Sequence, residues 1–276
     1  MRLDRLTALH HLGLVFDVTD AGPLDGTPVV LLHGFPEDRS SWDAVSTTLH
    51  AAGLRTFAPD QRGYSPGARP AGTAAYRLEH LVGDVLALAA ATGHERVHLV
   101  GHDWGGGIAW LTAANHPDRV ASVTVLATPH PAALSRALRT FDQLRRSWYM
   151  AAFQVPLLPE RVVAAGFRSL LVGSGLPLEH ADRYAARLAG PELLRGPINW
   201  YRAVRSSHVR AHRVTVPTTY VWGSRDVALG RRAAELTREH VTAPYEFIEL
   251  DASHWLPETH PDECARAIVR RVSSVA

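Results

Sequence analysis

The chain has 276 residues, enough for one large domain or two small ones, and 46% of them are hydrophobic, which suffices for a sizeable core. All 29 basic residues are arginines, and the absence of lysine excludes a Walker A phosphate loop, a Schiff-base enzyme and a kinase, because each needs a primary amine. The single cysteine, Cys264, excludes an internal disulfide and a cysteine-based zinc site, and the net charge of +2 with scattered arginines is not that of a nucleic-acid-binding protein.

The first residues lack the uninterrupted apolar core of a secretion signal. No apolar run approaches the length of about 18 residues that is typical of a membrane span. We therefore expect a soluble, cytoplasmic protein without a membrane span.

Short apolar runs alternate with amphipathic segments along most of the chain. Residues 78–91, for example, place Leu78, Leu81, Val82, Val85 and Leu88 at helical spacing. Strand–helix alternation predicts a mainly parallel sheet with helices on both faces. The predicted strands are residues 28–33, 54–59, 97–101, 120–126, 218–222 and 245–250, and the predicted helices are residues 78–91, 106–116, 233–240 and 261–272.

The segment from 130 to 212 has a different pattern. It contains helical pieces broken by five prolines and no convincing strand. A helical block inserted between two strands of a sheet is expected to cover one end of that sheet. The sequence thus predicts a core formed by residues 1–129 and 213–276, with residues 130–212 inserted as a helical cap.

Polar turns follow four of the predicted strands, where ligands bind in open parallel sheets. The most specific turn holds Asp103 between Gly101 and Gly105. Small flanking residues allow an abrupt strand-to-helix turn that points the central side chain outward, as in a nucleophile elbow, although an acidic helix N-cap is the competing interpretation. Because Asp226 and His254 follow later strands in the order nucleophile, acid, histidine, we favour the nucleophile.

These motifs resemble those of the α/β-hydrolase superfamily over essentially the whole chain. The elbow Gly-His-Asp-Trp-Gly-Gly at 101–106, His-Gly-Phe-Pro at 33–36 and Asp-Gln-Arg-Gly-Tyr-Ser at 60–65 are similar to the branch of epoxide hydrolases and dehalogenases. Tyr149, four residues before Phe153-Gln154, and Tyr201, within Asn-Trp-Tyr-Arg, resemble the two cap tyrosines of soluble epoxide hydrolases. The resemblance implies an α/β-hydrolase fold with an eight-stranded, mostly parallel sheet.

The resemblance also implies the hydrolysis of an epoxide to a vicinal diol, with epoxide and water as the only reaction partners and neither cofactor nor metal. Asp103 would attack the epoxide and form an ester, while Tyr149 and Tyr201 protonate the leaving oxygen. His254, oriented by Asp226, would then activate water. The family motif assigns the oxyanion hole to the backbone N–H groups of Phe35 and Trp104.

Other interpretations stay open at this point. Asp251 competes with Asp226 as the partner of His254, and the two cap tyrosines are also compatible with core packing. We expect His102 to be structural, His33 to order the oxyanion loop, and an apolar substrate cavity to be lined by Trp104, Trp148, Trp200 and Phe153.

Two alternative functions compete with the epoxide hydrolase. A dehalogenase would use the same Asp103, with indole N–H groups such as those of Trp104 or Trp148 holding the halide. A ligand-binding protein on a hydrolase scaffold would bind its ligand without catalysing a reaction. Detoxification, lipid metabolism and biosynthesis are all compatible with the sequence as physiological settings.

Overall fold

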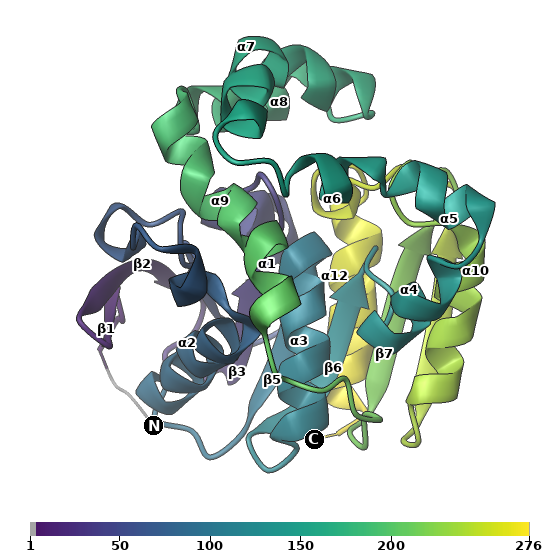
Figure 1. Ribbon diagram of the computed structural model, residues 1–276. Coiled ribbons are helices and arrows are strands. Elements are labelled where there is room, and N and C mark those ends of the chain that lie inside the picture. The colour runs from purple at the N-terminus through teal and green to yellow at the C-terminus, as the bar shows by residue number, and fades with distance from the viewer. Residues whose placement is uncertain (1–3, 276) are drawn as a thin grey trace.

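The computed structural model describes residues 4–275, in which an eight-stranded sheet is covered by helices on both faces (Figure 1). The strand order is β1-β2-β4-β3-β5-β6-β7-β8, with β1–β2 and β2–β4 antiparallel and every other neighbouring pair parallel. The strands are β1 Ala8–His11, β2 Leu14–Ala21, β3 Thr27–Leu32, β4 Leu54–Pro59, β5 Val97–His102, β6 Val120–Leu126, β7 Thr218–Gly223 and β8 Tyr245–Leu250.

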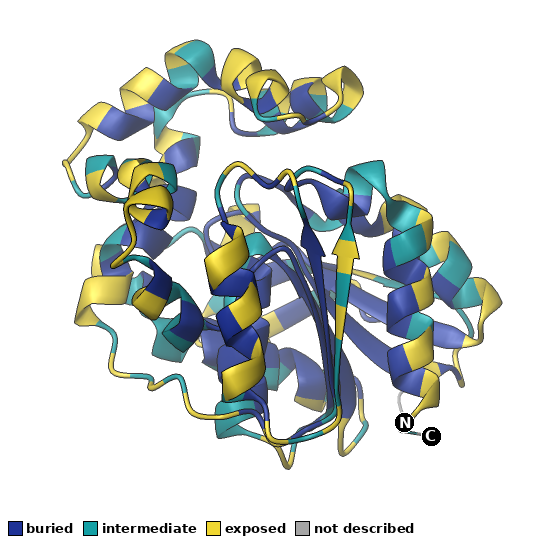
Figure 2. Cartoon of the chain, turned by 90° about the vertical axis from the view of Figure 1, so that its right-hand side faces the viewer, coloured by how far each residue is buried: buried dark blue, intermediate teal, exposed yellow. Residues whose placement is uncertain are grey.

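The helices bury the sheet from two sides. Helices α1 and α12 pack together in one apolar cluster, and α2 and α3 contribute to a second cluster on the opposite face. The central strands β3, β5 and β7 are buried except for Thr27 at the start of β3, whereas the helices alternate buried and exposed residues (Figure 2). The helices of this core are α1 Asp43–Ala51, α2 Leu78–Ala91, α3 Asp103–Asn115, α10 Arg231–Leu236, α11 Leu256–Thr259 and α12 Pro261–Ser273, with short 3-10 turns at Arg39–Trp42, Pro66–Ala68, Thr73–Tyr76 and Thr237–His240.

The predicted eight-stranded, mostly parallel sheet with helices on both faces is confirmed, and all six predicted strands lie within one residue of their observed bounds. The strand pattern did not identify β1 and β2, because these antiparallel edge strands are only partly buried and mix polar with apolar residues. The predicted helix 106–116 instead begins at Asp103, and the predicted helix 233–240 divides into α10 and a 3-10 turn.

The chain between β6 and β7, all of it described, is helical and contains no strand. Its helices α7 and α8 lie above the carboxyl ends of the parallel strands (Figure 1). The helices are α4 Pro131–Ala137, α5 Phe141–Arg146, α6 Trp148–Ala152, α7 Leu158–Gly173, α8 Leu178–Arg187 and α9 Pro191–Ala203, followed by a 3-10 turn at Val204–Ser206. This arrangement supports our proposal that residues 130–212 are a cap.

Two glycines of α3 offer a direct stability test. A Cβ at Gly105 would lie 2.2 Å from the Leu32 carbonyl oxygen, whereas a Cβ at Gly107 would have no atom within 4 Å. We expect Gly105→Ala to reduce the free energy of unfolding by about 1–3 kcal/mol, because α3 must move away from β3. Gly107→Ala should increase it by about 1 kcal/mol through helix propensity alone. Urea unfolding measures both, and equal effects would contradict the packing argument.

Candidate active site

Asp103 lies at a forced turn between β5 and α3. Its φ is +47°, a left-handed conformation that a residue with a Cβ adopts only under strain of about 1–3 kcal/mol. A Cβ at Gly101 would lie 2.3 Å from the Gly105 carbonyl oxygen, so the turn closes only because both of these flanking residues are glycines. The tight turn presents the Asp103 carboxylate beyond the end of the sheet.

His254 lies between two carboxylates. Its Nε2 is 3.5 Å from Asp103 Oδ2, and its Nδ1 is 2.7 Å from Asp226 Oδ2. The three side chains come from segments that follow β5, β7 and β8, whose carboxyl ends meet at the same edge of the sheet. The structure therefore brings together the three side chains that the sequence assigned to nucleophile, base and orienting acid.

Asp226 is held on both sides of its carboxylate. Its Oδ1 accepts hydrogen bonds from the backbone N–H groups of Ala228 and Leu229 at 2.8 and 2.9 Å, which leaves Oδ2 for His254. The rival acid Asp251 has a side chain that is 81% exposed and lies 3.3 Å from Arg225. The partner of His254 in the structure is thus Asp226.

Asp226 and Asp103 determine the protonation state of His254. Burial alone lowers the pKa of His254, but the charges of Asp226 and Asp103 outweigh it and hold that pKa well above the ordinary value. Burial alone raises the pKa of Asp103, but His254, His102 and the Phe35 N–H together hold it below the ordinary value. The resting site therefore favours an imidazolium at His254 and an ionised carboxylate at Asp103.

The loop after β3 supplies one predicted oxyanion donor. The Phe35 backbone N–H donates to Asp103 Oδ1 at 2.7 Å. A Cβ at Gly34 would lie 2.3 Å from Asp103 Cβ, so a glycine is required for this close approach. The second predicted donor, the Trp104 N–H, belongs to the first turn of α3, where N–H groups have no partner within the helix.

Buried Glu37 joins three parts of the site, and the sequence pattern did not reveal it. Its carboxylate accepts the Gly34 N–H at 2.6 Å and lies 2.6 Å from His102 Nδ1. His102 Nε2 in turn lies 2.9 Å from the carbonyl oxygen of His254. Glu37 directly follows the His-Gly-Phe-Pro motif, and this position next to the predicted oxyanion loop was the one sequence feature that could have indicated its place in the site. Both ring nitrogens of His102 thus face protein atoms, which supports the expectation that this residue is structural.

Tyr149 of α6 and Tyr201 of α9 border the same cavities as Asp103. Their ring centres are 5.9 Å apart, and Tyr201 packs edge-on against Trp104 at 4.9 Å and Phe35 at 5.6 Å. Burial, reinforced by the negative charge of Asp103, raises the pKa of both phenols well above the ordinary value. Both hydroxyl groups are therefore protonated, and able to donate, at neutral pH.

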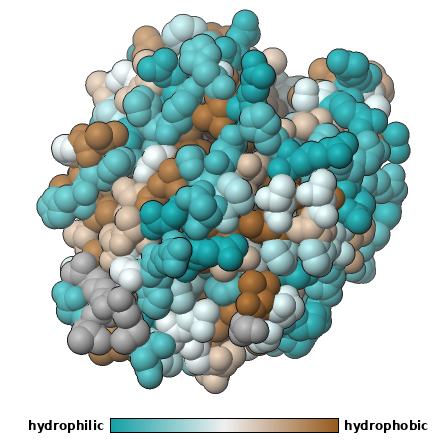
Figure 3. Space-filling view, turned by 90° about the horizontal axis from the view of Figure 1, so that it is seen from below, coloured by the Kyte–Doolittle hydropathy of each residue, from teal (hydrophilic) through white to brown (hydrophobic). Residues whose placement is uncertain are grey.

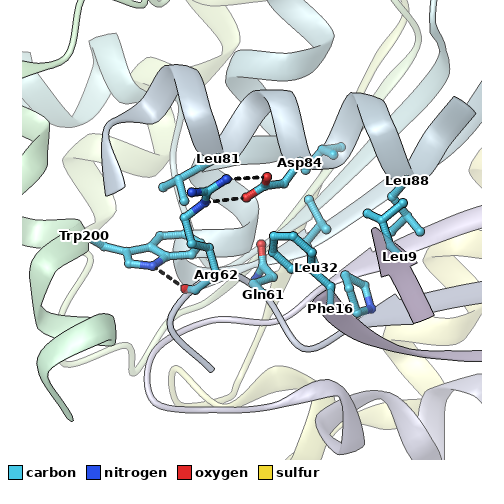
Figure 4. Close-up of a pocket in the computed structure, with 11 residues that line it drawn as sticks. Leu9, Phe16, Leu32, Gln61, Arg62, Leu81, Asp84, Leu88 and Trp200 are labelled. Atoms are coloured by element: carbon cyan, nitrogen blue, oxygen red, sulfur yellow. Dashed lines mark hydrogen bonds and ion pairs between the residues drawn. The ribbon is translucent and has the colours of Figure 1, made fainter. Parts of the chain in front are cut away.

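One predicted pocket residue lies elsewhere. Trp200 is only 2% exposed, and its Nε1 donates to the Arg62 carbonyl oxygen at 2.9 Å. It borders a cavity of about 20 Å³ beside the ion pair of Arg62 with Asp84, which has contacts of 2.8 and 2.7 Å (Figure 4). The prediction that Trp200 lines the substrate cavity was wrong. Its indole anchors α9, which carries the neighbouring Tyr201.

Within the described chain, two cavities meet at Asp103, Tyr149 and Tyr201. The first, of about 340 Å³, includes Trp104 and is otherwise bordered mainly by apolar residues, among them Ile108 and Leu111 of α3 and Leu134 of α4. The second, of about 390 Å³, includes Trp148 and Phe153 together with aromatic and aliphatic residues of α7. The reacting centre thus has apolar space on two sides.

Metal-binding and membrane-spanning features are both missing from the part of the chain that the structure describes. No cluster of three or more His, Cys, Asp or Glu side chains has the arrangement of a metal site in residues 4–275. None of the helices in that range is both long and apolar enough to span a membrane.

Known proteins resemble the chain over most of its length. A family model described as the alpha/beta hydrolase fold matches residues 27–174. The AB hydrolase superfamily protein YfhM of Bacillus subtilis is 33% identical over 90% of this chain and 91% of its own length, and human epoxide hydrolase 4 is 35% identical over 91% and 73%. A solved structure from a study of novel epoxide hydrolases in metagenomes from hot environments is 28% identical, with a TM-score of 0.83 and 99% coverage of both chains.

The carboxylate pair predicts how His254 titrates. Asp226→Asn removes one negative charge, so we expect the pKa of His254 to fall, whereas Asp251→Asn should leave it unchanged. Because the folded-state pKa of His254 lies above the unfolded value of about 6.5, its interactions stabilise the fold below that pH and are lost as pH rises through the folded-state value. The stability lost in Asp226→Asn should therefore be greater in mild acid than in alkali.

NMR titration of the His254 imidazole and urea unfolding at the two pH values test this expectation. The same fall in pKa in both variants would contradict the assignment of Asp226 as the partner.

Proposed function

Because the chain belongs to the α/β-hydrolase superfamily and, within it, to the epoxide hydrolase family, we propose that it hydrolyses an apolar epoxide to a vicinal diol through an ester on Asp103. One observation carries this proposal. The His254–Asp226 pair approaches Asp103 from one side, and two protonated phenols border the same cavities as its carboxylate.

In the first step, a carboxylate oxygen of Asp103 attacks one carbon of the epoxide ring. The C–O bond to that carbon breaks, and the departing oxygen takes a proton from Tyr149 or Tyr201. The products are a hydroxyalkyl ester on Asp103 and a phenolate. An ionised carboxylate needs no base to activate it, so the lowered pKa of Asp103 suits this step.

In the second step, water attacks the ester carbonyl carbon while His254 accepts a proton from the water. The N–H groups of Phe35 and Trp104 would stabilise the oxyanion, and collapse of the tetrahedral intermediate releases the diol oxygen, which takes the proton from His254. The proton left on the Asp103 carboxyl group then passes to His254 and restores the resting imidazolium. Before the second step, ester formation removes the charge of Asp103, one of the two charges that raise the pKa of His254, so His254 gives its proton to the phenolate and becomes the neutral imidazole that this step needs.

The two cavities suggest the shape of the substrate. Each cavity is mostly apolar, and both contain Asp103 and the two phenols. An epoxide with apolar substituents on both ring carbons would fill them together. We therefore favour such a disubstituted epoxide as the substrate.

A dehalogenase is the competing enzyme. It would need N–H donors for the departing halide, and of the two indoles considered above, Trp148 is 69% exposed, so a halide beside that side chain would be largely hydrated. Two phenols suit a developing alkoxide better than a halide. Chloride release from a chloroalkane, measured beside diol formation from an epoxide, separates the two reactions, and halide release alone would contradict our proposal.

His254→Gln is expected to trap the ester. The first step does not require the histidine as a base, whereas the second does. Intact mass spectrometry should show the variant heavier by one epoxide, with the added mass on the peptide that contains Asp103. A His116→Gln variant, changed at a histidine outside both cavities, should turn over without accumulating the adduct. Absence of the adduct, with wild-type turnover confirmed, would contradict the covalent route.

Tyr149→Phe and Tyr201→Phe are each expected to slow ester formation, by a factor on the order of 10², because each removes a proton donor. The double variant should be slower still. Single-turnover rates measure the first step alone, and Tyr245→Phe, on β8 and outside both cavities, is the matched control. An unchanged rate in the double variant would remove the two phenols from the mechanism.

A further inference from the structure

Exposed apolar side chains are concentrated in one part of the molecule. In residues 4–275, fifteen large hydrophobic side chains are exposed, and ten of them lie between Phe141 and Leu178. This segment runs from α5 to the start of α8, and Figure 2 shows exposed residues along the upper helices. The opposite end of the molecule is mostly hydrophilic, with apolar residues scattered among polar ones (Figure 3). Such a concentration indicates an interaction surface.

The exposed residues form two stripes. Phe141, Leu144 and Trp148 are three and four residues apart on the consecutive helices α5 and α6. Leu158, Val162 and Leu170 are spaced by multiples of four on α7, so they share one face of that helix. All six side chains are 57–80% exposed, while the other face of α7 is buried through residues such as Phe167. We call these six residues the apolar stripes.

The apolar stripes meet the entrance of the second cavity. Trp148 from one stripe and Leu170 from the other both border that cavity, which reaches Asp103. Since both residues are more than half exposed, the cavity opens at the point where the stripes converge. An apolar molecule could thus pass from the apolar stripes into the cavity along Trp148 and Leu170.

Arginines accompany the apolar stripes. Residues 139–178 contain five arginines and two acids, a net charge of +3 in a segment of forty residues, while the whole chain carries +2. One of the acids, Glu160, is buried and paired with Arg202 at 2.6 Å, so it adds little negative charge to the surface. Arg161 lies beside Val162 and Arg145 beside Leu144, and both arginines are exposed. Apolar side chains flanked by arginines match a lipid surface with anionic headgroups.

We propose that the apolar stripes dock on an anionic lipid bilayer, which delivers its dissolved apolar substrate to the cavity entrance between Trp148 and Leu170. The delivery of an epoxide depends on the proposed function, whereas the docking itself does not. A second copy of the chain fits this surface less well, because it would cover the cavity entrance and bring arginines of the same sign together.

Co-sedimentation of the full chain with lipid vesicles tests the docking. We expect binding to vesicles of phosphatidylcholine and phosphatidylglycerol in equal parts, and binding on the order of ten-fold weaker to pure phosphatidylcholine, because the arginines then lose their anionic partners. The double variant L144Q/V162Q should bind the mixed vesicles at least about ten-fold more weakly, since its polar side chains no longer enter the bilayer. Neither Leu144 nor Val162 borders either of the two cavities at Asp103.

The double variant L24Q/F247Q is the matched control, because it changes two exposed apolar residues outside the apolar stripes. It should bind vesicles as the wild type does. With a short, water-soluble epoxide, all three proteins should have the same activity, whereas only L144Q/V162Q should be slow on a long-chain epoxide carried in the mixed vesicles.

Three results would overturn the docking proposal. The first is no vesicle binding by the wild type, and the second is an equal loss of binding in the two double variants. The third is light scattering that shows a wild-type dimer and a monomeric L144Q/V162Q variant, with no affinity of the wild type for vesicles. If the wild type binds vesicles but hydrolyses no epoxide in either form, the docking stands and the proposed function fails.

Discussion

The turn at Asp103 is the constraint on which the site depends. Its φ of +47° is retained because β3, β5 and α3 approach so closely that only glycines fit at Gly34, Gly101 and Gly105. The packing energy of the sheet therefore holds the Asp103 carboxylate in a strained position just beyond the strand ends. The same close approach brings the Phe35 N–H within 2.7 Å of that carboxylate, so one packing arrangement positions both the proposed nucleophile and one of its proposed oxyanion donors.

Electrostatics then connects Asp103 to the two loops that follow β7 and β8. His254 is stabilised as an imidazolium by Asp226 and Asp103 together, so a change in the charge of Asp103 alters the basicity of His254. Behind this group, the pair of Glu37 and His102 links the oxyanion loop to the carbonyl of His254. Buried, mutually bonded charges of this kind fix geometry more than they add stability. These buried contacts therefore hold the loops that carry the proposed catalytic residues in fixed positions relative to one another.

The helices between β6 and β7 complete the site from the other side. Tyr201 is placed by its neighbour Trp200, which is hydrogen-bonded to the Arg62 backbone, and Arg187 at the end of α8 pairs with the buried Asp60 and Asp38 of the core. These contacts fasten α8 and α9 to the core, whereas α5–α7 present the apolar stripes to the outside. One layer of helices thus supplies the proposed proton donors, the cavity walls and an exposed apolar surface.

The sequence by itself determined the local structure. Buried runs such as Val97–His102 have the hydrophobic pattern of a central strand, and the glycines around Asp103 indicate a tight turn, because a Cβ on either flank would clash with the backbone. The order of Asp103, Asp226 and His254 along the chain, together with the resemblance of their motifs to the α/β-hydrolase superfamily, predicted the roles that we propose. The half-buried edge strands β1 and β2 were not identified, because a mixed polar and apolar pattern at a sheet edge is weak.

Only the tertiary structure decided which side chains meet. It separated Asp226 from the exposed Asp251, placed Trp200 behind α9 rather than in a cavity, and brought Glu37 to His102. It also joined the apolar stripes at the entrance of the cavity. The physical reason is that these contacts link residues far apart in the chain, and their geometry depends on how whole helices pack. Local sequence patterns do not determine that packing and therefore could not predict these contacts.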